Sequence, residues 1–199
     1  MQQATISLPL GKATLTVPAE DAARILIEQF TRTSSTPAVK LPKIGELWPE
    51  QGGVYAGLMR GQSGQPDYHL IVADTEAGFV KEITWGGYEK DEPNAKSEWD
   101  GQANTLALAR SDIEHPAAEW ASGLEINGYA DWYLPARREA ALCYANVPEL
   151  FEKAWYWTSA QCSPGVAWYQ GFVDGYQNTY HKGNELRARA VRRFVNLSL

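Results

Sequence analysis

The first 32 residues change from a two-residue to a helical spacing of hydrophobic positions. Hydrophobic residues recur at every second position in 6–10 and again in 14–17, on either side of Gly11. Two alternating runs around a glycine predict a β-hairpin. From Pro18 to about Thr31 the apolar residues share one helical stripe. A hairpin and one helix bury too little surface to be stable alone, so we expect residues 1–32 to serve attachment or oligomerisation.

The rest of the chain shows a different pattern after a linker. Residues 33–43, rich in Ser, Thr and Pro, predict the linker. A second domain is expected over residues 44–199, where short strand-like runs are broken by glycines. Residues 53–59 and 68–73 are predicted to be two strands around a turn at 61–67. Between these runs, 104–122 is helical in pattern, and Pro116 either interrupts this helix or begins another. A further helix is expected near Pro135, and the sum is an α+β fold with helices between sets of antiparallel strands.

Composition and charge narrow the function classes. The chain has 199 residues, of which 44% are hydrophobic and 12% aromatic, and this content excludes a disordered protein. No apolar run approaches the roughly 20 residues of a membrane-spanning helix. The net charge of -6 argues against nucleic acid as a partner. The N-terminal pattern predicts no Sec signal, so we expect a cytoplasmic protein before release, or a virion component such as a phage tail protein.

Five short motifs follow one another in the second domain. In chain order they are Gly101–Thr105, Asp131–Pro135 with Glu139 four residues further on, Trp155–Ser159, Ala167–Trp168 with Phe172, and Arg187–Arg192. Their order resembles that of the Lcl C-terminal-domain family, over about residues 44 to 194. The resemblance implies a C-type-lectin-like fold with short antiparallel strands and two helices. It also implies a phage or prophage protein, and some members of the family resemble the variable proteins of diversity-generating retroelements.

The same resemblance divides the residues into scaffold and variable positions. In such retroelements, adenine mutagenesis of Asn-type codons reaches many residue types but excludes Gln, Lys, Glu, Trp and Met. Between Trp168 and Arg189, the resemblance marks six framework residues: Gln170, Phe172, Gly175, Gln177, Lys182 and Glu185. The residues between them are all of types that this mutagenesis can produce. The expected scaffold is Asp131, Trp132, Leu134, Pro135, Trp155, Trp157, Trp168, Phe172, Arg187 and Arg189. The expected variable ligand-binding surface is Cys162, Gly165, Val166, Tyr169, Gly171, Val173, Asp174, Tyr176, Asn178, Thr179, Tyr180, His181, Gly183 and Asn184.

The residue types of the variable section suit recognition. Tyrosine supplies a large, rigid contact area at small entropic cost, while small polar residues supply adaptable hydrogen bonds. More than half of the chain's aromatic residues fall between Tyr129 and Tyr180. We expect Trp132, Trp155 and Trp157 to lie in the core, and the tyrosines of the variable section to be exposed on one face.

Other chemistries have weaker support. The triplet Glu92–Asn94 matches the sugar-specifying motif of calcium-dependent lectins, but it precedes the Asp131 motif, so we expect a polar turn, no metal and no cofactor. Cys143 and Cys162 form no closely spaced pair. Formylglycine-generating enzymes of this fold class use paired cysteines, so a sulfatase-modifying enzyme stays open as an alternative.

Single polar residues have structural explanations. His69 and His115 are expected to be structural, and His181 to face a ligand. Glu149 and Glu152 are three residues apart, the spacing of a solvated helical face or of a hydrolytic pair. The alternation of Arg187 and Arg189 with alanines predicts a strand with one polar face and a buried salt bridge, rather than a phosphate site.

These observations predict a binding protein rather than an enzyme. The expected function is the display of a diversified surface for phage receptor binding, with a protein or glycan on a cell surface as the ligand. A homo-oligomer, a trimer by analogy, would add avidity. A non-variable lectin-like adhesin is the remaining alternative.

Overall fold

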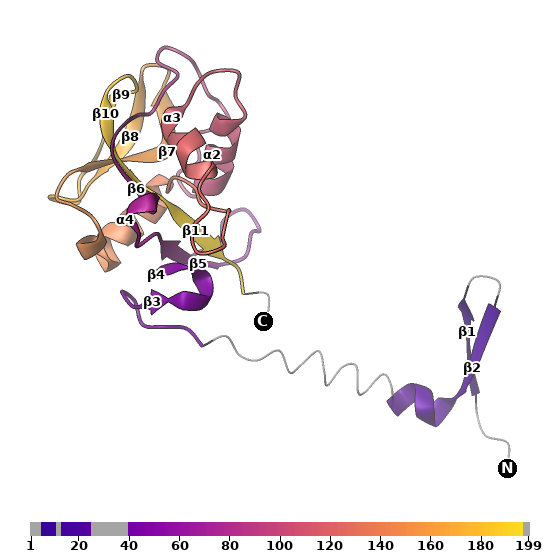
Figure 1. Ribbon diagram of the computed structural model, residues 1–199. Helices are drawn as coiled ribbons and strands as arrows, with labels where there is room; N and C mark the ends of the chain where they lie inside the picture. Colours follow the sequence, from indigo (N-terminus) through magenta and orange to yellow (C-terminus); the bar gives the residue numbers. More distant parts are fainter. Residues whose placement is uncertain (1–4, 11–12, 25–39, 197–199) are drawn as a thin grey trace. The chain divides into compact units, whose positions relative to one another are not determined.

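The computed structural model describes residues 5–10, 13–24 and 40–196 (Figure 1). The chain divides into two compact units, one of residues 1–40 with 197–199 and one of residues 41–196. No helix in the described ranges is long and apolar enough to cross a membrane.

The first unit contains the predicted β-hairpin. Strand β1 (Thr5–Leu10) pairs antiparallel with β2 (Ala13–Pro18). Ile6 lies opposite Val17 and Ser7 opposite Thr16, so one face of the hairpin carries apolar residues and the other polar ones. Residues 19–24 are helical. The rest of the predicted helix, and the predicted linker as far as residue 39, lie outside the described residues.

The second unit contains two sheets. The four-stranded sheet has the order β11-β5-β4-β3 and is antiparallel throughout. Its strands are β3 (Leu47–Trp48), β4 (Gly53–Met59), β5 (Tyr68–Val72) and β11 (Val191–Phe194). The two strands predicted around the turn 61–67 are therefore confirmed as β4 and β5.

The five-stranded sheet carries the predicted variable section. Its order is β6-β10-β7-β8-β9. The strands are β6 (Phe79–Thr84), β7 (Trp155–Ser163), β8 (Val166–Gly171), β9 (Gln177–His181) and β10 (Glu185–Arg189). All neighbours are antiparallel except β10 and β7, which run parallel where Arg187 lies opposite Tyr156. The expectation of purely antiparallel strands is wrong at this one pair.

Three α-helices connect the strands of the second unit, where two were expected. They are α2 (Gly101–Ala109), α3 (Pro116–Ser122) and α4 (Arg137–Asn146). Pro116 occupies the first turn of α3, where its missing N–H has no cost, so the long helical pattern divides there. Short 3-10 turns cover Pro49–Gln51, Glu76–Gly78 and Pro148–Leu150.

The core of the second unit has two parts. One cluster joins β4 and β5 to α4 and to Tyr156 and Phe172 of the five-stranded sheet and its following turn. The other joins α2 and α3 to Trp85, Trp157 and Tyr169. In Figure 1, α2 and α3 lie beside β7, and the four-stranded sheet lies at the other end of the unit. The architecture is α+β, as predicted.

Candidate functional site

Most of the predicted variable residues lie at the surface, on β8, β9 and the turns beside them. Tyr176 is 64% exposed, Val173 58% and Tyr180 37%. Exposed as well are Cys162, Asp174, Asn178, His181, Gly183 and Asn184, while Gly165, Val166 and Thr179 are half-buried. Tyr169 and Gly171 are buried, so the expectation that they are exposed is wrong.

The burial of Tyr169 has a simple cause in the register of β8. Tyr169 lies opposite Trp157 of β7, and residues directly opposite in a sheet point to the same face. Trp157 is fully buried, and both side chains belong to the cluster around Trp85. A tyrosine in this register is therefore packed beneath the surface, although its neighbours in β9 reach solvent.

The predicted residues also divide between the two faces of the sheet. Asn178 lies opposite Tyr169, and Tyr180 lies opposite Ala167, which places these four side chains on one face. Thr179 and His181 alternate to the other face. The expectation of a single exposed face therefore holds only for part of the set.

The other face is closed in part by α4. The guanidinium of Arg137 lies over the Trp168 ring, 3.6 Å from its centroid. Gln177 donates to the Arg137 carbonyl at 2.7 Å and to the Gln170 side-chain oxygen at 2.8 Å. Thr179 and His181 therefore lie on the face that α4 covers in part. His181 also stacks on Tyr88, with ring centroids 5.5 Å apart.

Trp155 contacts two tyrosine rings on the face of the sheet that carries the buried Tyr169. The Trp155 and Tyr169 rings stack with centroids 5.0 Å apart, and Trp155 meets Tyr180 edge to face at 6.0 Å. Trp155 is 44% exposed, so the expectation that it lies in the core with Trp132 and Trp157 is wrong. The cause is its position as the first residue of β7, opposite Gly171, which has no side chain to cover the indole.

The framework residues between the variable positions have structural roles. Lys182 is fully buried, and its Nζ donates to Gln161 Oε1 at 2.6 Å and to the Lys90 carbonyl at 2.8 Å. Burial lowers the pKa of Lys182 to about 8. The ammonium lies 4.7 Å from the centroid of the Trp85 ring. Lys182 therefore ties the β9–β10 turn to the loop before α2.

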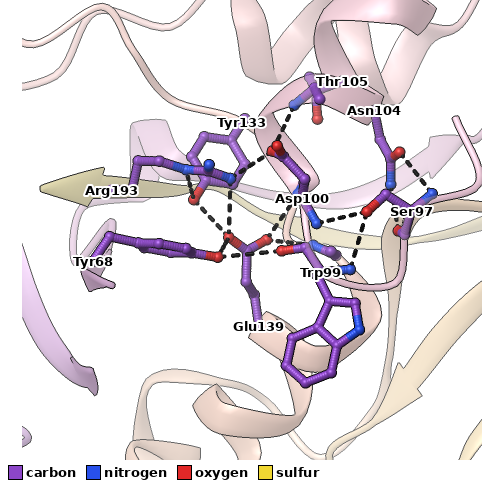
Figure 2. Close-up of polar contacts among 12 residues, drawn as sticks. Tyr68, Ser97, Trp99, Asp100, Asn104, Thr105, Tyr133, Glu139 and Arg193 are labelled. Carbon is purple, nitrogen blue, oxygen red and sulfur yellow. Dashed lines mark hydrogen bonds and ion pairs between the residues drawn. The ribbon is translucent and has the colours of Figure 1, made fainter. Parts of the chain in front are cut away.

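Glu139 of α4 is the centre of a second buried polar network (Figure 2). Its Oε1 accepts hydrogen bonds from Tyr68 at 2.6 Å and Tyr133 at 2.8 Å. Its Oε2 accepts from the backbone N–H groups of Ala136 at 2.7 Å and Gly101 at 3.2 Å. Burial raises the pKa of Glu139, whereas Arg193 and the Tyr68 hydroxyl oppose this shift.

This network links segments that are distant in sequence. Arg193 of β11 lies 3.5 Å from Glu139 Oε1 and 2.7 Å from Asp100 Oδ1. Asp100 in turn caps α2 by accepting from the Ala103 N–H at 2.9 Å. The network thus joins β5, the N-termini of α2 and α4, and β11.

The arginine pattern at the end of the chain gives a different result from the one expected. Arg187 pairs with Glu152 at 2.8 Å in a partly exposed contact, and Arg189 donates to the Ala73 carbonyl. The buried guanidinium is instead that of Arg192, which pairs with Asp131 at 2.7 Å. The prediction of a buried salt bridge from Arg187 or Arg189 is wrong, because the next strand carries it.

The lectin-like triplet and the two cysteines, which were the other candidates for chemistry, have structural surroundings. Glu92 of the lectin-like triplet accepts from Ser111 at 2.8 Å and lies 3.0 Å from His115 Nε2. Within the described ranges, no group of three or more His, Cys, Asp or Glu side chains is arranged to hold a metal ion. Cys143 is buried and Cys162 exposed, and both are free thiols.

Sequence reasoning missed two features of this region. The sequence motif that contains Trp155 indicated a scaffold residue. The exposure of Trp155 follows from its pairing with Gly171, and this cross-strand pairing cannot be read from the sequence. The Glu139 network had one signal in the sequence, the glutamate that follows Pro135 within the motif. No protein-family model matches the chain, and no curated protein matches it either.

Proposed function

We propose that the chain is a ligand-binding variable protein of a diversity-generating retroelement, with a C-type-lectin-like scaffold and a role in phage receptor binding. The exposed part of β8, β9 and their turns is the binding surface. Its ligand is a protein or a glycan on a cell surface, and the first unit attaches the protein to a virion or to further copies of itself. Recognition is non-covalent, with tyrosines as anchors.

One observation carries this proposal: framework and variable residues differ in burial. Of the six framework residues, Gln170, Phe172 and Lys182 are 5% exposed or less. Gly175, with a positive φ of 78°, and Gln177 are half-buried, and Glu185 is exposed. The residues between them are mostly exposed. A protein that changes its surface without losing its fold needs this division, because surface substitutions away from packed positions have small effects on stability.

The DNA that encodes the chain tests the retroelement part of the proposal. We expect a near-copy of the segment coding for residues 168–193, differing mainly at adenines, beside a reverse transcriptase gene. A neighbourhood with no such repeat would contradict the retroelement and leave a non-variable binding domain.

Two matched libraries test the binding surface. In the first, the exposed positions Val173, Asp174, Tyr176, Asn178 and Tyr180 are randomised together. In the second, the framework positions Gln170, Phe172 and Lys182 are randomised. We expect most members of the first library to fold, as measured by protease resistance on a display system, and most of the second to unfold. Equal losses in both libraries would show that the exposed positions are structural.

A further inference from the structure

Trp155 is the exposed tryptophan that the scaffold assignment does not explain. One side of its indole is covered by Tyr169, whose ring plane is tilted by 26° relative to it. The indole is nevertheless 44% exposed. A tryptophan with this much free surface in an otherwise packed sheet presents apolar area that a ligand can cover.

The indole also lines a hollow of about 430 Å³ at the β6-β10-β7 side of the sheet. Val173 of the variable set lines the same hollow, so the hollow borders the variable surface. The remaining lining residues are mostly charged, with both signs present: Lys81, Glu82, Lys153, Glu185 and Arg187. Among the ion pairs of the described residues, only Arg187 of this set takes part, with Glu152.

The charged lining distinguishes between two kinds of ligand. The centre of a protein–protein interface is depleted of charged residues, because each would have to be desolvated. A saccharide has the opposite requirements. Each hydroxyl group both donates and accepts hydrogen bonds, so it can use the ammonium of a lysine and the carboxylate of a glutamate together. The apolar face of a sugar ring, rich in C–H groups, covers an indole.

We propose that Trp155 and the charged hollow beside it form a saccharide-binding subsite, with Trp155 as a fixed anchor next to the variable residues. This inference rests on the proposed function in placing the subsite at the edge of the binding surface. Trp155 precedes the segment 168–193 that is expected to be diversified, so mutagenesis of that segment leaves the anchor unchanged. Variation at Val173, Tyr176 and Tyr180 then selects among glycans that share a ring stacked on Trp155.

An array of immobilised neutral and acidic oligosaccharides tests the subsite with the full-length chain. We expect binding to one or more of these glycans. Isothermal titration with the free oligosaccharide that binds best should then show at least about tenfold weaker binding by Trp155→Ala, from lost stacking and apolar burial. The matched control is Trp99→Ala, which removes another tryptophan, 36% exposed, that does not line this hollow. This control should bind as the unaltered chain does.

A second measurement protects the test against loss of folding. In ¹H–¹⁵N spectra, the Trp155 indole resonance, identified by its loss in Trp155→Ala, should shift on titration with the bound oligosaccharide. Glu185→Gln should weaken binding while leaving the other indole resonances in place. Binding unaffected by Trp155→Ala, or no binding to any oligosaccharide on the array, overturns the subsite.

The outcomes also separate the subsite from the proposed function. Saccharide binding that depends on Trp155 but not on Tyr176 or Tyr180 supports the subsite and contradicts the variable surface as its specificity element. Selection of protein binders from the first library, together with a silent array, supports the variable surface and overturns the saccharide.

Discussion

Glu139→Gln tests whether the buried network of Figure 2 holds the scaffold together. The substitution keeps the volume of the side chain and replaces one carboxylate oxygen with an NH₂ group. In the folded protein, five groups donate to the two oxygens: two tyrosine hydroxyls, two backbone N–H groups and, at 3.5 Å, the Arg193 guanidinium. An amide supplies only one oxygen, so its NH₂ group faces either the two backbone N–H groups, which cannot accept, or the two hydroxyls, whose O–H groups then lose their acceptor.

The expected loss of unfolding free energy depends on whether each displaced donor can reach another acceptor. If the NH₂ group faces the hydroxyls, Tyr68 can donate instead to the Trp99 carbonyl, 3.2 Å away, whereas among the described residues the Tyr133 hydroxyl donates only to Glu139. A buried donor without a partner costs about 1–3 kcal/mol, and Arg193 loses one of its two carboxylates. The sum is about 2–4 kcal/mol of unfolding free energy.

Urea unfolding followed by tryptophan fluorescence measures this change in the second unit alone, since all eight tryptophans lie between residues 41 and 196. The matched control is Glu98→Gln. Glu98 pairs with Arg137 and Arg138 at the surface, with its side chain 41% exposed, and should cost under about 1 kcal/mol. A loss at Glu139 no larger than at Glu98 would refute the reasoning that the network is a stability determinant.

Three further predictions concern other parts of the second unit. Lys182 has a pKa of about 8 in the folded protein, below its ordinary value of 10.5, so between these pH values the unfolded chain binds more protons than the folded one. From pH 8 to pH 9.5 the unfolding free energy of the protein should therefore rise relative to that of Lys182→Met. Gly175→Ala should cost at least about 1–2 kcal/mol because φ is 78° there, whereas Gly183→Ala, with nothing within 4 Å of the added Cβ, should leave the thermal midpoint nearly unchanged. In the native protein Cys162 should react with a thiol reagent within minutes, whereas Cys143, whose pKa is raised by burial, should react only on unfolding; equal rates for the two thiols would contradict their assigned burial.

Local patterns predicted the elements well where one face of an element is buried. The strands 53–59 and 68–73 were correct because their apolar runs are flanked by turn residues. The two faces of the first hairpin also follow from alternation alone. Helix boundaries did not follow from the local pattern, because a proline can either interrupt a helix or begin one. The structure shows that Pro116 begins α3.

The candidate site depended on information that local patterns do not contain. Tyr169 and Tyr180 are both tyrosines in adjacent strands, yet the first is buried and the second exposed. Their difference comes from the strand on the far side: Tyr169 is covered through its pairing with β7, and Tyr180 belongs to the edge strand β9. Cross-strand pairing is a long-range property, so residue type could not assign it.

The sequence by itself determined that this protein is folded, α+β and acidic, because composition and hydrophobic period act within short windows. The tertiary structure decided which aromatic residues face solvent, since exposure is set by the neighbouring strand and its side chains. It thus moved Trp155 from the core to the protein surface and Tyr169 from the surface to the core. It also placed Glu139 beside Arg193, a pairing that requires α4 and β11 to meet.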